Sequence, residues 1–437
     1  MNRLYKKLLG CMVAVGLTAC APSAWAQLTI QITHGVSAPI PIGLVPFGSD
    51  ALLPVDVAGV INSDLDRSGR FVGLARSNML QTPTTAAAVD FAQWRLVKTD
   101  YVVIGRVVAN GKGMYRVEFE LFNVVTAERL LGFALPATVK NLRLVAHQAS
   151  DMIYEKILGV PGAFATQIAY VSVQGTPRSR RWRLVIADSD GEMPRTVLES
   201  KFPIMSPSWA PDGERLAYVS FEGEASAVYV QTLLTGARDR VSARAGINGA
   251  PAFSPDGKRL ALALSQSDGN VDVFVLDLAA RTTLRVTDDP AIDTEPSWAP
   301  DGRSLYFTSD RSGRPQIYKI NLSAGAQAQR VTFEGNYNAR PRVSPDGTLL
   351  AVVTLDQGVY RIASVEAATG RSRVLSTGRL DEAPSFAPNG QTILYSARGA
   401  GHGVLETAAI DGSVTSRISA LDADVREPAW SPRVATR

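Results

Sequence analysis

The sequence has very few residues that can form disulfides or thiolate centres. Only two of its 437 residues are cysteine, Cys11 and Cys20, and both lie before residue 27. A chain that begins at Gln27 therefore has no disulfide, no zinc–thiolate site and no cysteine nucleophile. Its stability has to come from hydrophobic cores, and the 411 residues from Gln27 onward are enough for two domains.

The first 26 residues have the pattern of a cleaved secretory signal peptide. A basic start, MNRLYKK, precedes an apolar run from Leu8 to Ala19, and the segment ends in Ala24-Trp25-Ala26, a small-x-small cleavage site. The run of about a dozen apolar residues is shorter than the roughly 20 that cross a bilayer. We therefore expect export, with Gln27 as the mature N-terminus and no direct membrane insertion of the mature chain.

A second processing route is compatible with the same segment. The tetrapeptide LTAC at 17–20 resembles a lipoprotein processing box, in which Cys20 would become a lipidated anchor. The intact mass of the mature chain distinguishes lipidation at Cys20 from cleavage after Ala26.

Charge of one sign is scarce once this segment is removed. The whole chain has 45 Lys and Arg against 41 Asp and Glu, and three of the basic residues belong to the signal peptide. The mature chain therefore has a formal net charge of +1 at pH 7. Because nucleic-acid binding requires a basic surface that replaces counterions, the composition gives no reason to expect a nucleic-acid partner.

What the chain has in abundance is one motif of seven residues. Consecutive copies are 43 to 45 residues apart, a period in the range of four-stranded propeller blades. Apolar runs of strand length, such as RLAYVS after the first copy, follow the motif and are separated by Gly, Asp and Asn turns. The repeat predicts a six-bladed β-propeller over residues 161–437. The copies read PSWAPDG at 207–213, PAFSPDG at 251–257, PSWAPDG at 296–302, PRVSPDG at 341–347, PSFAPNG at 384–390 and a shortened PAWSP at 428–432.

The motif combines the residues that a tight hairpin turn requires. Proline presets φ for the first corner, Asp suits the second, and Gly accepts the left-handed conformation that closes the turn. The motif Asp is therefore interpreted as a turn residue and not as a catalytic carboxylate. Val343, Asn389 and the missing Gly of the sixth copy predict looser packing or turns in the later blades. The aromatic residues two places after the first proline are expected to wedge between blades: Trp209, Phe253, Trp298, Phe386 and Trp430.

The two ends of the repeat region are complementary. The segment QIAYVSV at 167–173 resembles a strand that follows a motif, but no motif precedes it. The last motif, at 428–432, has no strand after it. We therefore expect the two segments to pair and to close the ring, which leaves the sheet no open edge.

Residues 27–160 follow a different pattern, that of a small α/β domain preceded by a flexible strand. The strand, QLTIQITHG at 27–35, alternates apolar and polar residues. Apolar residues recur with helical spacing in two later segments, and GVPGAF at 159–164 is the expected joint to the propeller. The pattern predicts helices over 55–66 and 141–159, and a β-hairpin of 101–109 with 114–124.

A search for a catalytic set finds almost nothing. The three histidines, His34, His147 and His402, are scattered over strand, helix and loop patterns, and His147 is placed at the boundary of its helix's apolar stripe. No G-x-S-x-G nucleophile elbow occurs, so a serine hydrolase of the α/β type has no support. We therefore expect no enzymatic activity and no cofactor, apart from a cation such as calcium that the channel could hold.

Two interpretations with chemistry stay open beside a binding protein. The first is a propeller that gates a peptidase, which would need a nucleophile and a further domain. The second is a cation-dependent propeller enzyme that acts on sugars or lactones. Calorimetric titration with calcium, followed by an activity screen, distinguishes the second from a binding protein.

Acidic residues gather in the loops that precede the motif prolines. In a propeller these loops lead from the outer edge of one blade to the central channel, so their side chains would meet at one mouth. A ring of carboxylates around a cavity is typical of a surface that docks a protein or binds a cation, although solvated loop tips have the same composition. The residues concerned are Asp293, Thr294, Glu295, Asp381, Glu382 and Glu427.

Six segments, taken in order, resemble one known family. Together they are similar to the TolB family, the periplasmic component of the Tol-Pal envelope system, over essentially the whole mature chain. The propeller repeat is shared with peptidase-associated propellers, so the N-terminal segments give the resemblance its specificity. The segments read PIGLVPF at 41–47, DLDRSGRF at 64–71, SDMIYEKILGVPGAFATQIAYVS at 150–172, MSPSWAPDG at 205–213, NGAPAFSPDGKRLALALS at 248–265 and DTEPSWAPDG at 293–302.

The resemblance implies a monomeric, non-enzymatic adaptor that maintains envelope integrity and outer-membrane constriction at cell division. In this family the propeller mouth binds the peptidoglycan-associated lipoprotein Pal. The N-terminal strand is recognised by the inner-membrane protein TolA, and other envelope proteins are further candidate partners.

The family's binding residues can be carried over position by position. Ile247 departs from the family pattern, in which a polar residue such as His is common. The Pal-facing positions would be Ile247, Asn248, Gly249, Ala250, Thr294 and Glu295, to which the loop argument adds Asp381 and Glu382. The TolA-facing positions would be Gln27, Leu28, Thr29, Ile30, Gln31, Ile32, Thr33 and His34.

Overall fold

The computed structural model describes residues 38–50, 52–176, 178–223, 225–399, 401–418 and 424–433. The signal peptide expected at 1–26 and the TolA-facing positions Gln27–His34 lie outside the described residues. Within the described part of the chain, no helix combines the length and the apolar composition that a membrane crossing requires.

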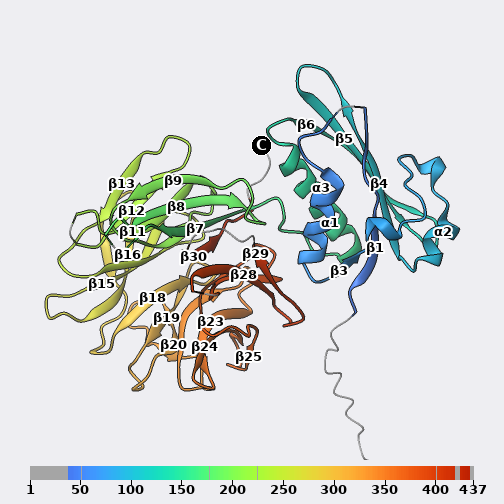
Figure 1. Cartoon of the computed structure of the whole chain (residues 1–437). Helices are drawn as coiled ribbons and strands as arrows, with labels where there is room; N and C mark the ends of the chain where they lie inside the picture. The colour runs from blue at the N-terminus through green and yellow to red at the C-terminus, as the bar shows by residue number, and fades with distance from the viewer. Residues whose placement is uncertain are drawn as a thin grey trace, which may run out of the picture. The chain divides into compact units, whose positions relative to one another are not determined.

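The N-terminal part of the described chain folds around a mixed sheet (Figure 1). Its strands are β1 (Ile40–Leu44), β2 (Gly48–Ser49), β3 (Phe71–Gly73), β4 (Tyr101–Ala109), β5 (Met114–Asn123) and β6 (Arg129–Thr138). The strand order is β3-β1-β4-β5-β6, with β2 paired to β4. β1 runs parallel to both β3 and β4, whereas β4, β5 and β6 form an antiparallel meander. The predicted hairpin of β4 and β5 is confirmed.

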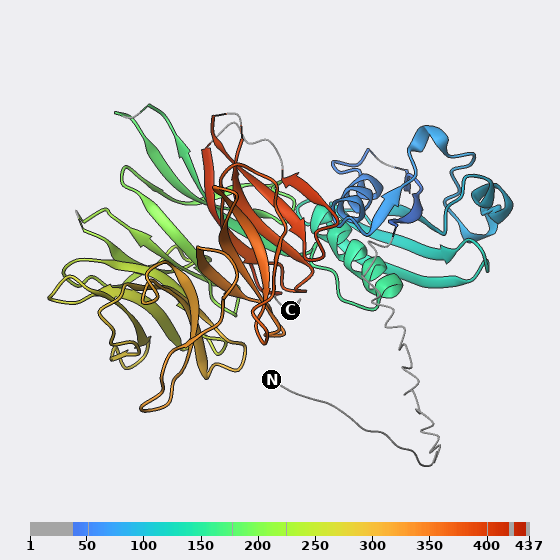
Figure 2. The same cartoon turned by 90° about the horizontal axis from the view of Figure 1, so that it is seen from below.

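Helices cover both faces of this sheet. α1 (Val57–Arg67) and α3 (Leu142–Leu158) pack on each other and on one face, where Val103 and Val107 of β4 join their core. Figure 2 shows α3 beside the strands of the sheet. The short α2 (Phe91–Leu96) places Trp94 against the opposite face, on Val102 and Ile104. Burial on both faces explains why β4 is a nearly continuous apolar run.

Local capping sets the ends of the two long helices. Asp56 is the N-cap of α1, and its carboxylate accepts the N–H of Gly59 at 3.0 Å, so the helix begins two residues later than predicted. α3 agrees with the predicted helix and ends at Gly159, whose φ of 72° is left-handed. The boundary position expected for His147 on α3 is wrong, because its side chain is 1% exposed.

The rest of the chain forms six four-stranded antiparallel sheets, which confirms the predicted six-bladed propeller. Blade one consists of β10 (Ile204–Trp209), β11 (Arg215–Ser220), β12 (Ala227–Thr232) and β13 (Arg238–Ser242). Blade two consists of β14 (Asn248–Phe253), β15 (Arg259–Ser265), β16 (Val271–Asp277) and β17 (Thr283–Arg285). Blade three consists of β18 (Asp293–Trp298), β19 (Ser304–Ser309), β20 (Gln316–Asn321) and β21 (Gln329–Arg330).

The remaining three blades follow the same order. Blade four consists of β22 (Asn338–Val343), β23 (Leu349–Asp356), β24 (Val359–Glu366) and β25 (Ser372–Val374). Blade five consists of β26 (Asp381–Phe386), β27 (Thr392–Arg398), β28 (Gly403–Ala409) and β29 (Thr415–Ile418). Blade six takes β7 (Gln167–Gln174), β8 (Arg181–Asp188) and β9 (Arg195–Ser200) from one end of the repeat region and β30 (Asp424–Trp430) from the other.

Blade six closes the ring as the sequence predicted. β30 pairs with β7 in an antiparallel register that sets Trp430 opposite Ile168. Beyond the strand, Ser431 N donates to Gln167 O at 2.8 Å, and Gln167 N donates to Ser431 Oγ at 2.9 Å. The two ends of the repeat region are therefore joined along almost the whole of β7, with one register shift between Arg426 and Ala429.

The motif aromatics lie between neighbouring blades, as expected. Trp209 of blade one donates its indole N–H to Ala429 O of blade six at 3.1 Å. Trp298 of blade three does the same to Ala252 O of blade two at 3.0 Å. Val343 takes this place in blade four and packs half-buried against blade three.

The looser turn expected at Asn389 is not found. Its Oδ1 accepts the N–H of Gln391 at 3.1 Å, the bond that Asp346 makes to Thr348 in the blade before. The amide adds a second bond, because Asn389 Nδ2 donates to Pro161 O at 3.2 Å in the segment that enters the propeller. Asp could not donate this bond, which gives the substitution in the fifth motif a physical reason.

Candidate functional site

The innermost strand of each blade is irregular at the same place. Its pairing shifts register around the motif proline, as between Thr294 and Ser297 in β18. The residue before the proline has a positive φ in all six blades, between 47° and 55°. Residues with a side chain rarely adopt this conformation, and each case costs on the order of 1–3 kcal/mol. The six residues are Ser206, Ala250, Glu295, Arg340, Ala383 and Glu427.

Three of these six positions carry charged side chains that meet inside the channel. Arg340 Nε lies 2.6 Å from Glu295 Oε1, and Arg340 Nη2 lies 3.0 Å from Glu427 Oε1. Arg340 belongs to blade four and Glu427 to blade six, so the second ion pair crosses the channel between blades that are not neighbours. We call Glu295, Arg340 and Glu427 the channel triad.

The channel triad is tightly held in a partly buried position. The backbone N–H of Arg340 donates to Glu295 Oε2 at 3.0 Å, and Thr308 Oγ1 donates to the same oxygen at 3.1 Å. The negative charge of Glu427 has the largest influence on Arg340 and raises its pKa above the ordinary value. Burial acts in the opposite direction, and the charge of Glu295 again raises the pKa. Arg342, two residues further along the same strand, adds a second guanidinium, and burial lowers its pKa.

The first residue of several innermost strands is a buried Asn or Asp that folds the loop before it. Asp381 accepts the hydroxyl proton of Ser376 at 2.5 Å, and Asp293 accepts two hydrogen bonds from Arg311. These two carboxylates and Asn248 are 0% exposed. Burial, the largest influence, raises the pKa of both Asp293 and Asp381. The expected ring of free carboxylates is therefore wrong for Asp293 and Asp381, which anchor loops.

Two apolar side chains are exposed in the loops of the mouth. Ile247 and Ile292 are about half exposed, at 50% and 51%, and Glu382 is an exposed carboxylate on blade five. These three residues form the exposed rim. Gly249, Ala250 and Thr294 are partly exposed behind this rim. The structure thus divides the predicted Pal-facing positions into an exposed rim and a buried support.

Two cavities occupy the channel on either side of the channel triad. One, of about 440 Å³, opens at the mouth and is lined by Trp182, Arg340, Glu382, His402, Arg426 and Glu427 among others. The other, of about 470 Å³, is lined by motif prolines from all six blades and by Arg342. Glu427 lines both cavities, so the channel triad lies between them.

Sequence reasoning found Glu295 and Glu427 but missed Arg340, the cation that joins them. Its signal was available, because Arg340 stands directly before a motif proline, as Glu295 and Glu427 do. The left-handed conformation at this position had no signal in the residue types, since Ser, Ala, Glu and Arg all occupy it.

Comparison with known proteins agrees with this architecture over almost the whole chain. A family model described as the TolB amino-terminal domain matches residues 28–130, and one described as the TolB beta propeller domain matches residues 154–434. The Tol-Pal system protein TolB of Xanthomonas oryzae pv. oryzae is 49% identical over 435 residues, which cover 98% of this chain and 99% of that protein. The chain belongs to the TolB family.

Further relatives support the same family. The Tol-Pal system protein TolB of Xanthomonas campestris pv. campestris is also 49% identical, over 98% of this chain and 99% of its own. The crystal structure of TolB from Acinetobacter baumannii superposes with a TM-score of 0.84 at 38% identity, and covers 90% of this chain and 97% of that one. Membership of the TolB family makes this chain a component of the Tol-Pal system.

Proposed function

We propose that this chain is a non-enzymatic adaptor of the periplasm that links Pal, bound at the propeller mouth, to TolA, bound by residues 27–34. Through this link it would maintain envelope integrity and outer-membrane constriction at cell division. The proposal takes residues 1–26 as a cleaved signal peptide, 27–160 as the N-terminal domain and 161–437 as the propeller. It is supported by the family and, in the structure, by the construction of the mouth.

The observation that carries the proposal is a pair of exposed isoleucines at the mouth, above a channel in which Arg340 is paired with two carboxylates. Ile247 and Ile292 are half exposed, and Glu382 adds an exposed carboxylate to the same rim. Exposed apolar side chains with a charged neighbour are typical of a protein-docking surface. We assign direct contact with Pal to Ile247, Gly249, Ala250, Thr294 and Glu382.

The buried members of the predicted set have a supporting role in this proposal. Asn248 and Asp381 fix the loops that carry the rim, through hydrogen bonds to loop atoms such as Ser376 Oγ. Glu295 is bound to Arg340, so a charge reversal at Glu295 would disturb the channel triad as well as any contact with Pal. A substitution at Glu295 therefore tests the mouth less cleanly than one at Glu382.

The same geometry supports a function without catalysis or a cofactor. An acid–base pair of carboxylates needs one group that is free to exchange a proton with a substrate. Glu295 and Glu427 both contact Arg340 instead. Calorimetric titration with calcium should show no binding in the channel, and saturable binding coupled to hydrolysis of a lactone or sugar would support the enzyme alternative.

Recognition of TolA would use main-chain hydrogen bonds of the alternating N-terminal segment. An extended segment of this kind adds a strand to the exposed sheet edge of a partner. Deletion of residues 27–34 should abolish TolA binding and leave the affinity for Pal unchanged. Loss of both activities would show that the two sites are not separate.

The mouth is tested with purified Pal and the substitutions Ile247→Asp and Glu382→Lys. Each places a charge that the wild-type rim lacks, and we expect the affinity for Pal to fall about tenfold or more, measured by isothermal titration calorimetry. The matched control is Glu366→Lys, a partly exposed carboxylate at the end of β24 that lies next to the turn away from the mouth. Equal affinity of all three variants would place the Pal site elsewhere.

A further inference from the structure

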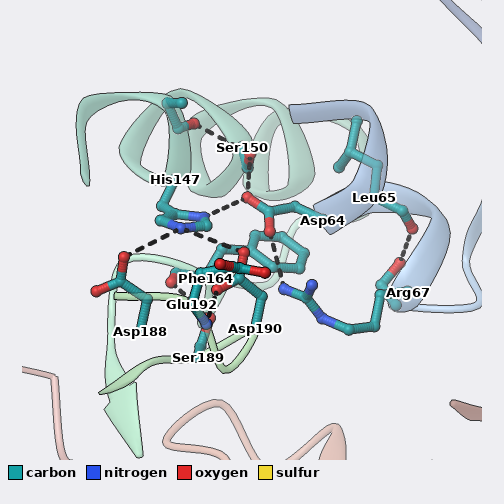
Figure 3. A network of polar contacts seen from close by, with 12 residues as sticks. Asp64, Leu65, Arg67, His147, Ser150, Phe164, Asp188, Ser189, Asp190 and Glu192 are labelled. Carbon is teal, nitrogen blue, oxygen red and sulfur yellow. Dashed lines mark hydrogen bonds and ion pairs between the residues drawn. The ribbon is translucent and has the colours of Figure 1, made fainter. Parts of the chain in front are cut away.

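A second group of charged side chains is buried where α1 and α3 meet the turn between β8 and β9 of blade six (Figure 3). It joins the two domains through side chains from both. We call it the interdomain cluster, and its members are Asp64, Arg67, Arg143, His147, Asp188 and Asp190.

The centre of the interdomain cluster is a histidine oriented by a carboxylate of its own domain. His147 Nδ1 lies 2.7 Å from Asp64 Oδ2, which also accepts the hydroxyl proton of Ser150 at 2.7 Å. The other oxygen of Asp64 lies 2.8 Å from Arg67 Nη2. Because Asp64 and His147 are both buried to 1% exposure or less, the ring has one orientation available.

The second nitrogen of His147 points at the propeller. Its Nε2 lies 3.9 Å from Asp188 Oδ2 and 3.8 Å from Asp190 Oδ2, in the turn that follows β8. Among the described residues, Nε2 has no hydrogen-bond partner. A buried nitrogen that faces two carboxylates without a bond is unfavourable unless it carries a positive charge.

The charges of the interdomain cluster balance only if the imidazole is protonated. Three carboxylates, of Asp64, Asp188 and Asp190, face two guanidinium groups, of Arg67 and Arg143. A neutral His147 leaves one negative charge uncompensated in a buried site, and an imidazolium removes it. Further charged groups lie nearby: Asp151 on α3 with Arg433 close to it, Glu192 in the turn, and the partly buried pair of Arg70 with Asp411.

A proton fits this site better than a divalent cation does. Asp64, His147 and Asp190 are close enough together to suggest metal ligands. Arg143, however, contacts Asp190 Oδ2 directly and lies 3.6 Å from Asp188 Oδ2, so it occupies the two oxygens that face Nε2. A metal ion bound there would lie against a guanidinium, which the Coulomb repulsion between them disfavours.

We propose that protonated His147 is a pH-responsive latch that holds the N-terminal domain on blade six and weakens as the imidazole loses its proton. Asp64 remains with His147 when the domains separate, since both belong to the N-terminal domain. Only Asp188 and Asp190 are gained on docking, and their charges give the latch its dependence on pH.

The balance of influences on His147 supports this latch. Burial, the largest influence, lowers its pKa, but the hydrogen bond and charge of Asp64 and the charges of Asp190 and Asp188 outweigh it and raise the pKa above the ordinary value. His147 in turn helps Arg67 and Arg143 to outweigh burial and lower the pKa of Asp190.

The sign of the pH dependence follows from the two carboxylates gained on docking, Asp188 and Asp190, whose charges favour the protonated imidazole. A histidine whose pKa is higher in the docked than in the undocked state contributes its full stabilisation below the undocked pKa. That contribution is lost as the pH rises through the raised value. Docking should therefore be tighter in mild acid and weaker in mild alkali. The docking equilibrium constant should change roughly tenfold for each unit by which the pKa of His147 differs between the docked and undocked states.

Other contacts also hold the domains together in alkali. Arg70 Nη1 lies 3.1 Å from Asp411 Oδ2 across the interface, and the segment that joins the domains accepts hydrogen bonds from Ser189 Oγ at Phe164 O (2.8 Å) and from Asn389 Nδ2 at Pro161 O (3.2 Å). The latch therefore tunes an existing interface, and partial opening rather than complete release is the expected alkaline state.

The test is an NMR titration of the mature chain labelled with ¹⁵N-histidine. The chain has three histidines, so substitution assigns each imidazole directly. The imidazole signal that disappears in His147→Gln belongs to His147, and in the wild type it should titrate above pH 6.5. Asp190→Asn should lower this titration midpoint by about one unit, because an opposite charge within about 4–6 Å shifts a pKa by 1–3 units. The matched control is His402→Gln, which changes a histidine at the channel mouth.

Docking itself is measured by hydrogen exchange of residues 186–194 from pH 5.5 to 8.5, corrected for intrinsic exchange. In the wild type and His402→Gln, exchange should accelerate about tenfold across the range. In His147→Gln it should lose the part of this pH dependence that lies above pH 6.5, where the titration of Asp151 contributes little. The latch is overturned if the imidazole of His147 is neutral at pH 6. It is also overturned if the rate of hydrogen exchange does not change over the pH range in which His147 titrates. A titration that changes on addition of EDTA or zinc overturns it in favour of a metal site. If His147→Gln fails to fold, Asp190→Asn alone decides the outcome.

Discussion

The channel triad and the interdomain cluster solve the same electrostatic problem with different cations. In both, carboxylates from separate parts of the chain converge on one positive side chain in a partly or fully buried site. The channel uses Arg340, which bridges blades four and six, and the interface uses His147, which bridges the two domains.

The choice of cation decides whether the site responds to pH. A guanidinium keeps its proton at any pH that a folded protein meets, so the channel triad is a permanent support for the mouth. An imidazole exchanges its proton near neutral pH, so the interdomain cluster is an adjustable joint. The protein therefore combines a docking surface whose shape is fixed with a domain interface whose strength can change.

Removal of the fixed cation should have the largest effect. In Arg340→Met, Glu295 and Glu427 remain in the channel without their partner, and we expect a loss of about 3 kcal/mol in the free energy of unfolding at pH 7.5, by urea denaturation. Arg371→Ala, which breaks an exposed pair with Glu366, is the control and should change little. Equal effects of the two variants would show that the channel triad is not a support.

Removal of the carboxylate that orients the histidine should have an intermediate effect. In Asp64→Asn, the amide keeps an acceptor for Ser150 but loses the charge that faces His147 and Arg67, and we expect a loss of about 2 kcal/mol. The loss should be larger at pH 6 than at pH 8, because the protonated imidazole depends on this charge. Asp66→Asn, an exposed position of the same helix, serves as the control. A loss that is independent of pH would mean that His147 is neutral in the folded protein.

Asp151 gives the smallest predicted effect and separates two pH responses of the same helix. Its carboxylate accepts the N–H groups of Phe164 and Ala165 at 2.8 and 3.1 Å, and burial raises its pKa to about 6. A carboxyl whose pKa is higher in the folded state gains stability as the pH falls, here by about 1 kcal/mol between pH 6.5 and 5. Asp151→Asn should remove this gain in thermal or urea unfolding. If the gain remains in the variant, another group on the interface is responsible.

The propeller was predictable because its sequence repeats the physical requirements of one turn. Pro, Asp and Gly fix the hairpin in each copy, and the spacing leaves room for four strands. Even the closure by β7 and β30 followed from two segments that each lacked half of a blade. The short α2 and strand β3, three residues long, carry too little periodicity to be read from the sequence.

The functional sites were predictable only in part because they depend on contacts between distant segments. The loop pattern placed Glu295, Glu382 and Glu427 at the mouth, but it could not show that Asp293 and Asp381 turn inward to anchor their loops. His147 belongs to an ordinary helical pattern, and its partners Asp188 and Asp190 follow about forty residues later. Only the packing of the N-terminal domain on blade six brings them together.

The closure of blade six also imposes an order on biosynthesis. β7 is synthesised early and β30 last. β7 therefore has no partner at its inner edge until some 250 further residues, up to β30, have been translated. Until those residues emerge, the nascent chain presents an unpaired β edge that can join another copy. A chain cut short before Asp424 would keep that edge for its lifetime and is expected to aggregate or to be degraded.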